Sequence, residues 1–224
     1  MHFKDCPPHR RTMSHEGDCF LVPGPVRMAD NCLQAMATPV MTARVPEFRD
    51  VMAELNAGLR YAFNLSPSKG VKKTQSWTGE DGYKVVVVSG SGTAAMEMVV
   101  ANRFRANDLV LVPTNGKFGE RVVAICDQFC NVKHLKYEWG RSFDLYELEQ
   151  QLERGCYEAL LICHKETSTG ITQDAAAIAE MCERHNVAFI LDGITSVGSA
   201  TVHQAEWNAE AVVMGGQKCT AGPS

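Results

Sequence analysis

The 224-residue sequence has no long apolar run, no excess of positive charge and no low-complexity segment. Its longest apolar stretches, such as 85–88 and 159–163, fall far short of the roughly 20 residues that cross a bilayer. Lysine and arginine total 22 against 26 acidic residues, so the net charge of −4 lacks the strongly basic footprint of nucleic-acid binding. With 45% apolar and 21% charged residues, the composition is typical of a globular protein without membrane or nucleic-acid partners.

Nine cysteines are many for this length, yet no two form a C-x-x-C pair and their number is odd. Several of them, including Cys126, Cys163 and Cys182, stand within apolar stretches. We therefore expect reduced, mostly buried thiols in a reducing compartment. The first residues lack the apolar core of a secretory signal, and Asp5 and Glu16 argue against a transit peptide. The expected location is the cytoplasm, with an organelle as the alternative.

Cys6, His9, His15 and Cys19 form a C-x2-H-x5-H-x3-C pattern that superficially suits zinc. The loop between the two halves is shorter than that of a usual zinc finger, so we expect no metal site here. Residues 1–20 are instead predicted to form a poorly ordered N-terminal extension.

Apolar strand patterns alternate with amphipathic helix patterns along the rest of the sequence. We expect strands at 84–88, 109–112, 132–135, 159–163, 187–191 and 211–214, helices at 47–63, about 93–104, 119–129, 144–153 and 174–185, and a polar loop at 66–82. This alternation predicts an α/β fold, with a mostly parallel sheet and right-handed crossovers.

The glycine-rich segment 89–93, Ser-Gly-Ser-Gly-Thr, lies between an expected strand and an expected helix. Backbone N–H groups at such a helix start suit a phosphate. The same glycines, with Ala95, also fit the dinucleotide spacing G-x-G-x-x-A, but no acid ends the next strand to hold a ribose. A single phosphate is favoured over a nicotinamide dinucleotide, and a glycine turn without a ligand stays open.

Two more chemically informative residues follow expected strands, at the edge where parallel sheets bind ligands. Asp192 closes an apolar strand, where a carboxylate needs a cation or a strong donor, although a capping or metal-binding role also fits. Lys218 follows another strand through Gly-Gly-Gln and can form an imine with an aldehyde, although a lone lysine is more often a surface residue. A phosphate loop, a strand-end acid and a nearby lysine together match the needs of pyridoxal 5′-phosphate.

Six segments, in this order, resemble the class V branch of the fold-type I pyridoxal-phosphate aminotransferases. They are Leu-Val-Pro-Gly-Pro-Val (21–26), Ser-Gly-Ser-Gly-Thr-Ala-Ala-Met-Glu (89–97), Asn-Gly-Lys-Phe-Gly-Glu-Arg (115–121), His-Lys-Glu-Thr-Ser-Thr-Gly (164–170), Leu-Asp-Gly-Ile-Thr-Ser-Val-Gly (191–198) and Gly-Gly-Gln-Lys (215–218). The subgroup is similar to the alanine–glyoxylate, serine–glyoxylate and 2-aminoethylphosphonate–pyruvate transaminases. The resemblance implies a fold-type I large domain over residues 21–224, with the C-terminal small domain absent.

The resemblance also implies a role for each matching residue. Lys218 would hold the cofactor as a Schiff base and transfer protons, and Asp192 would pair with the pyridine nitrogen. Phe118 would stack on the ring and Ile194 would cover its other face. The remaining contacts fall to Ser91, Gly92, Thr93 and Gln217 on the phosphate, and to Thr167 near the phenolic oxygen.

The implied activity is transfer of an amino group between a small amino acid and a 2-oxo acid, with ping-pong kinetics, in a homodimer. The substrate-binding arginine of the family's small domain and the last strand of its large sheet lie beyond the segments matched here. Arg44 stands where the family has an arginine, but Ala43 replaces the preceding histidine.

Three alternatives remain. One is a lyase or desulfurase, which the Gln217 before Lys218 disfavours, because a desulfurase usually has a histidine there. The second is an inactive truncated paralogue or fragment that binds the cofactor or a partner subunit without catalysis. The third is a nicotinamide-dependent reductase.

Overall fold

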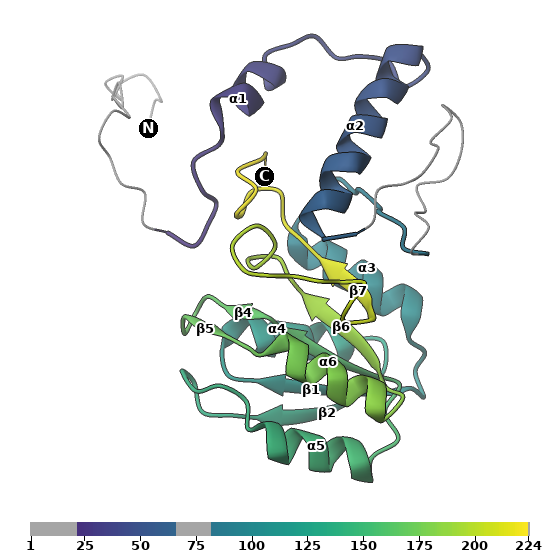
Figure 1. Cartoon of the computed structure of the whole chain (residues 1–224), viewed down its shortest axis with the longest axis vertical. Helices are drawn as coiled ribbons and strands as arrows, with labels where there is room; N and C mark the ends of the chain where they lie inside the picture. Colours follow the sequence, from purple (N-terminus) through teal and green to yellow (C-terminus); the bar gives the residue numbers. More distant parts are fainter. Residues whose placement is uncertain (1–21, 66–81, 224) are drawn as a thin grey trace, which may run out of the picture.

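The computed structural model describes residues 22–65 and 82–223, which form a parallel sheet between helices (Figure 1). The sheet has five strands in the order β2-β1-β3-β6-β7, and each neighbouring pair is parallel. Its members are β1 (Leu109–Thr114), β2 (Asn131–Lys136), β3 (Ala159–Cys163), β6 (Ala188–Asp192) and β7 (Ala209–Val213). The predicted α/β fold with a mostly parallel sheet is therefore confirmed.

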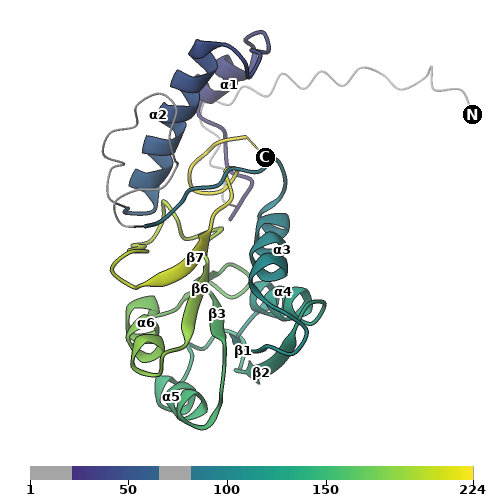
Figure 2. The same cartoon turned by 90° about the vertical axis from the view of Figure 1, so that its right-hand side faces the viewer.

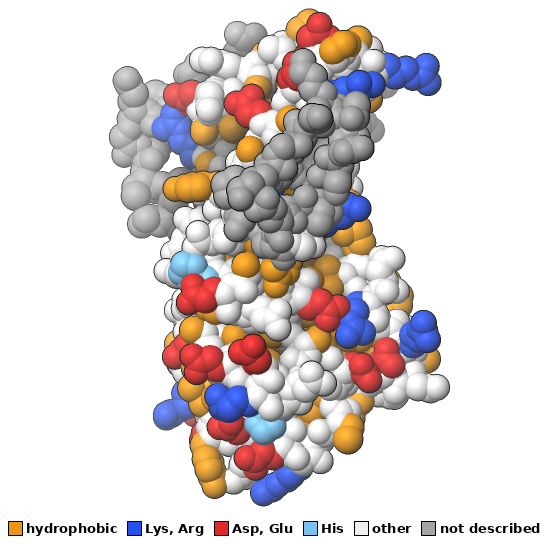
Figure 3. All heavy atoms as spheres, turned by 45° about the vertical axis from the view of Figure 1, so that its right-hand side comes forward, with side chains coloured by type: hydrophobic (Ala, Val, Ile, Leu, Met, Phe, Trp, Pro, Cys, Tyr) orange, Lys and Arg blue, Asp and Glu red, His pale blue; other side chains and the backbone are white. Residues whose placement is uncertain are grey.

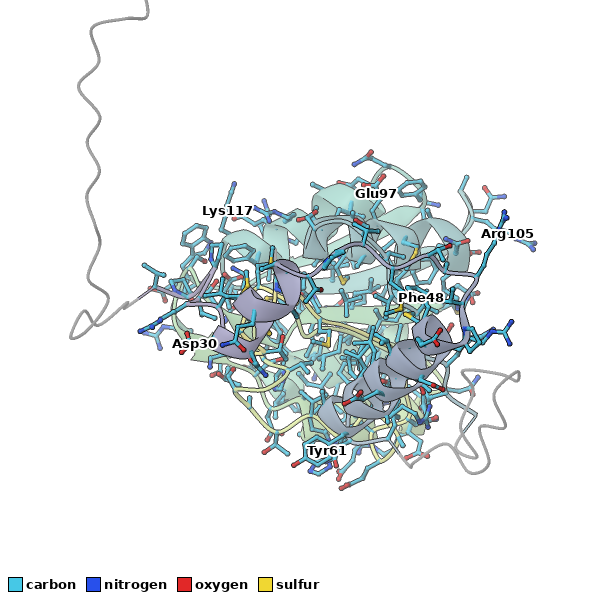
Figure 4. The ribbon with its side chains drawn as sticks, turned by 90° about the horizontal axis from the view of Figure 1, so that it is seen from above. Asp30, Phe48, Tyr61, Glu97, Arg105 and Lys117 are labelled. Atoms are coloured by element: carbon cyan, nitrogen blue, oxygen red, sulfur yellow. The ribbon has the colours of Figure 1, made fainter. Side chains whose placement is uncertain are left out.

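Helices cover both faces of this sheet. In Figure 2, α3 (Gly92–Arg103) and α4 (Lys117–Cys126) lie on one side and α5 (Leu145–Arg154) and α6 (Ala175–Arg184) on the other. The helices α1 (Asp30–Met36) and α2 (Pro46–Ala62) lie apart from these layers, beyond β7. A view from above shows Phe48 and Tyr61 near the two ends of α2 (Figure 4). Sequence reasoning missed α1 and the short antiparallel pair β4 (Lys165–Glu166) and β5 (Ile171–Thr172).

Side-chain caps explain why several helices start where they do. Asp144 precedes α5 and accepts hydrogen bonds from the backbone of Tyr146 and Glu147 at 3.0 and 3.1 Å. Asp174 caps α6 in the same way through Ala177 N, at 3.0 Å. Each cap satisfies N–H groups that have no partner inside the helix. The predicted helices at 144–153 and 174–185 agree with α5 and α6 to within a residue at each end.

The strands read as continuous apolar runs because both of their faces are buried. All five residues of β3 are buried. Its Leu160 and Ile162 belong to the apolar cluster that includes Leu148 of α5 and Ile178 of α6. The intervening Leu161 belongs to a second cluster, formed mainly with α3 and α4. Because successive side chains of a strand point to opposite faces of the sheet, β3 contributes to both apolar clusters.

The prediction of a buried strand at 84–88 is wrong. Residues 85–88 form no strand, and Val86, Val87 and Val88 are 61%, 50% and 41% exposed. An open cleft of about 2050 Å³ is lined by both this segment and β7 residues, including Ala211 and Val212. A run of valines favours an extended backbone, but only hydrogen bonds to a neighbouring strand make a sheet. No strand of the described five-stranded sheet pairs with residues 85–88.

One helix boundary needs correction, and several expectations concern residues that the structure does not describe. The helix predicted at 119–129 is α4, which ends earlier at Cys126, where residues 127–130 turn into β2. The zinc-like pattern, the extension at 1–20 and nearly all of the loop at 66–82 lie outside the described residues.

The cysteines and the surface charges can be compared with the expectations drawn from composition. All cysteines among the described residues are free: Cys126, Cys130, Cys163 and Cys182 are buried, Cys32 is half-buried, and Cys156 and Cys219 are exposed. Acidic and basic side chains mix over the visible face in Figure 3. In the parts of the chain that the structure describes, no helix is both long and apolar enough to cross a bilayer.

We predict that Leu161→Ala destabilises the protein by about 2–5 kcal/mol, because the deletion leaves a cavity in the centre of the sheet. The matched variant Leu33→Ala removes a side chain that is 51% exposed on α1, and should cost less than about 0.5 kcal/mol. Urea unfolding monitored by circular dichroism measures both. Equal shifts in the two midpoints would contradict this assignment of the core.

Candidate active site

A cavity of about 180 Å³ lies at the carboxyl edge of the sheet, between the starts of α3 and α4, the end of β6 and the lysine loop. It gathers eight of the nine residues that the sequence singled out: Ser91, Gly92, Thr93, Phe118, Asp192, Ile194, Gln217 and Lys218. These residues come from four separate segments of the chain. Three of these segments lie at or just after the carboxyl ends of β1, β6 and β7, which meet at one edge of the parallel sheet, and the start of α3 lines the same cavity.

Thr167 and Arg44 are placed elsewhere. Thr167 lies half-buried in the turn between β4 and β5 and does not line the cavity. Arg44 is exposed in the turn before α2 and is also absent from the lining.

Asp192 forms the acidic wall of the cavity. It is the last residue of β6 and only 7% exposed, and its Oδ1 accepts a hydrogen bond from Ile194 N at 3.0 Å. Burial raises the pKa of Asp192 to about 6. The hydrogen bond from Ile194 N lowers this pKa, whereas the charge of the nearby Glu166 raises it further. A carboxyl group held in this way pairs well with a protonated ring nitrogen, because the added positive charge removes the cost of its ionisation.

The start of α3 supplies the anion-binding side of the cavity. Ser91 is the N-cap, and its Oγ accepts a hydrogen bond from Ala94 N at 3.1 Å. Gly92 and Thr93 follow in the first turn, where backbone N–H groups have no partner inside the helix. The positive end of the helix dipole adds to the attraction for a phosphate.

Arg121 is a cavity residue that sequence reasoning missed. Its guanidinium lies 4.9 Å from the centre of the Phe118 ring, one turn earlier on α4. It also donates from Nη1 to Thr93 Oγ1 at 3.2 Å, and its positive charge favours ionised Asp192. The sequence feature that could have revealed Arg121 is its spacing of three residues from Phe118 within the segment 115–121, which places both on one face of a helix.

Gly24 is a second missed residue, and it packs directly on Lys218. A Cβ at this position would lie 2.5 Å from Lys218 Cδ and 2.9 Å from Nζ, and the backbone φ is +131°. Only glycine combines that conformation with that approach. The same segment donates Val26 N to Gln217 O at 3.0 Å, so residues 24–26 run along the lysine loop. The sequence motif identified residues 21–26 as a segment of interest, but it did not predict the contact between Gly24 and Lys218.

The donor set of the cavity fits pyridoxal 5′-phosphate. It combines a helix start for a phosphate, an aromatic ring, a buried carboxyl group and a primary amine around one small volume. The remaining lining is largely apolar, including Met96, Val122 and Ile125, and suits a flat ring.

Comparison with known proteins identifies relatives of one kind. The sequence profile described as "Aminotransferase class-V" matches residues 67–224. The (S)-ureidoglycine–glyoxylate transaminase of Bacillus subtilis is 30% identical over 206 residues, covering 92% of this chain and 46% of the relative. The serine–glyoxylate aminotransferase of Hyphomicrobium methylovorum is 29% identical over 205 residues, with 89% and 47% covered.

A solved structure agrees with these sequence matches. The alanine–glyoxylate aminotransferase of Nostoc sp. superposes with a TM-score of 0.78 at 29% identity, covering 90% of this chain and 50% of the other. The chain thus spans about half the length of the relatives it matches.

The raised pKa of Asp192 predicts a pH-dependent stability in the cofactor-free protein. Between about pH 4 and pH 6 the folded carboxyl group keeps its proton while the unfolded one has lost it, so the free energy of unfolding falls as pH rises. A rise of about two pKa units corresponds to about 3 kcal/mol. Asp192→Asn, which cannot titrate, should therefore become more stable relative to wild type by up to about 3 kcal/mol between pH 4 and pH 7.

Urea unfolding at several pH values measures this difference. The exposed Asp127→Asn variant controls for the loss of one negative charge. A wild-type and an Asp192→Asn protein with the same pH dependence would contradict the prediction.

Proposed function

Because this chain belongs to the class V aminotransferase family, we propose that the whole protein is a pyridoxal-phosphate-dependent transaminase. It would move an amino group between a small amino acid, such as alanine, serine or an aminophosphonate, and a 2-oxo acid, such as glyoxylate or pyruvate. The observation that carries the proposal is the meeting of Lys218, Asp192 and the start of α3 around one cavity.

Each residue of the cavity has a task in this proposal. Ser91, Gly92, Thr93 and Gln217 hold the phosphate, and Lys218 holds the cofactor covalently through its aldehyde carbon. Asp192 accepts the hydrogen bond of the protonated pyridine nitrogen, which lets the bound cofactor act as an electron sink. Phe118 would stack on one face of the ring and Ile194 would cover the other. Thr167, in the β4–β5 turn, does not line the cavity, so its role near the phenolic oxygen rests on the family resemblance alone.

Lys218 also carries the proton transfers. Once freed by the substrate amine, Lys218 Nζ would take up the proton that leaves the substrate α-carbon and would then give it back, as general base and then general acid. The half-buried setting of Lys218 against Gly24 limits the directions in which the amine can move. Hydrolysis would release the first 2-oxo acid before the second one binds and runs the steps in reverse, and this order would give ping-pong kinetics.

Substrate class, assembly and location also form part of the proposal. The names of the relatives refer to glyoxylate together with ureidoglycine, serine or alanine, which supports a small amino donor. We propose a homodimer, as in the family. The free, buried cysteines support a reducing compartment such as the cytoplasm. Residues 1–20 form an extension to a cofactor-binding domain at 21–224 in this proposal.

The experiment is reductive trapping. The protein is incubated with pyridoxal 5′-phosphate, reduced with borohydride and digested, and the modified lysine is located by mass spectrometry. We expect one pyridoxyl adduct, on Lys218, which disappears in Lys218→Arg and persists in the control variant Lys117→Arg, whose side chain is exposed near the start of α4 (Figure 4). No adduct, or labelling spread over surface lysines, would contradict the proposed cofactor site.

A second measurement separates transamination from binding alone. Unreduced protein from the same preparation, incubated with pyridoxal 5′-phosphate, is mixed with alanine, serine or 2-aminoethylphosphonate together with glyoxylate or pyruvate, and the new amino acid is quantified. Formation of glycine or alanine that requires Lys218 supports the transaminase. A protein that is labelled at Lys218 but yields no product with any pair is a cofactor-binding protein without this activity, and overturns the assignment.

A further inference from the structure

We propose that Glu166 is a positioning residue that fixes Phe118 at the cofactor cavity by capping α4 from a neighbouring hairpin. The inference rests on the proposed function for the task of Phe118, while the capping itself rests on the geometry of the chain. Glu166 does not line the cavity and has no role in the assignment above.

Glu166 is a fully buried carboxylate with a complete set of donors. Its Oε2 accepts hydrogen bonds from Phe118 N and Gly119 N, both at 2.9 Å. Its Oε1 accepts from Ser168 N at 3.1 Å and from Ser168 Oγ at 2.6 Å. All four groups donate, and an ionised carboxylate is the side chain that only accepts. Its 0% exposure leaves no water to replace these partners.

The start of α4 has no cap of its own. Its N-cap residue is Gly116, which has no side chain to accept a hydrogen bond. The first-turn N–H groups are satisfied instead by the β4–β5 hairpin, since Ser168 Oγ also accepts from Lys117 N at 2.9 Å. Gly116 permits this arrangement, because a Cβ there would lie 2.5 Å from Glu166 Cδ and 2.6 Å from Ser168 Oγ.

The hairpin also connects α4 to the opposite wall of the cavity. Thr195 Oγ1, three residues after Asp192, donates to Lys165 O at 2.9 Å. Thr195 O in turn accepts a hydrogen bond from Cys219 Sγ at 3.3 Å, next to Lys218. Glu166 therefore ties the backbone of Phe118 to the part of the chain that carries the acid and the lysine.

A second explanation for an effect of Glu166 on cofactor binding involves Asp192. The negative charge of Glu166 contributes to the raised pKa of Asp192, so removing it could alter the cofactor site without moving Phe118. The two explanations make different predictions. If Glu166 acts by positioning Phe118, its substitution has no effect on cofactor affinity once the Phe118 ring has been removed.

The first test measures amide hydrogen exchange of the cofactor-free protein. Glu166→Gln keeps the size of the side chain but replaces one acceptor oxygen by NH2 and removes the charge, so the hydrogen bonds from Phe118 N and Gly119 N are either lost or weakened. We expect exchange at Phe118 and Gly119 to accelerate about tenfold relative to wild type, the scale of one lost hydrogen bond. Glu180→Gln, at an exposed position on α6, should leave both rates unchanged. Unchanged exchange in Glu166→Gln would overturn the proposal.

The second test is a double-mutant cycle on cofactor affinity. Glu166→Gln should weaken binding of pyridoxal 5′-phosphate about tenfold in the wild-type background and less than about twofold in Phe118→Ala. Equal weakening in both backgrounds would assign the effect to Asp192 or to general loss of structure, and overturn the positioning role.

A milder variant keeps the test decisive if Glu166→Gln does not fold. Ser168→Ala removes one donor to Glu166 and the acceptor for Lys117 N, and should shift exchange and affinity in the same directions by a smaller factor. A wild-type protein that gains no label on Lys218 contradicts the proposed function, and the exchange experiment still decides whether Glu166 caps α4.

Discussion

The burial of one carboxyl group, Asp192 at the end of β6, is the constraint from which the rest of the site follows. Burying an ionised carboxylate without a partner is costly, and the single hydrogen bond from Ile194 N offsets only part of that cost. Burial consequently raises the pKa of Asp192 to about 6. In the proposed site a protonated pyridine nitrogen would supply the missing charge, so an acid that destabilises the empty fold near neutral pH would become a strong ligand for the cofactor.

The parallel sheet makes such a site possible because the segments that end or follow β1, β6 and β7 lie at one edge, beside the start of α3. The starts of α3 and α4, the end of β6 and the lysine loop are distant in sequence, yet they enclose one cavity of about 180 Å³. The start of α3, Arg121, Lys218 and Asp192 all line this cavity, so it combines positive groups suited to an anion with one buried acid. The same edge therefore offers separate places for a phosphate, a ring nitrogen and an aldehyde.

Sequence reasoning succeeded where the signal was local and failed where it depended on distant contacts. The periodic apolar residues located most helices and strands, and the positions at or after the ends of strands pointed to Asp192 and Lys218. The valines at 85–88 predicted a strand because they favour an extended backbone, but a strand needs a neighbour that the pattern cannot name. Gly24 against Lys218 and Glu166 against Phe118 are contacts between segments, which one sequence does not reveal.

The protonation state of the cofactor nitrogen tests the central claim most directly. Pyridoxal 5′-phosphate labelled with nitrogen-15 in its ring is bound to the protein, and its chemical shift is measured by NMR in the wild type and in Asp192→Asn. The structure predicts a protonated nitrogen in the wild type and a neutral one in the variant, because only the carboxylate stabilises the charge. A neutral nitrogen in the wild type, or a protonated one in both proteins, would contradict the assignment of Asp192 and of the cavity around it.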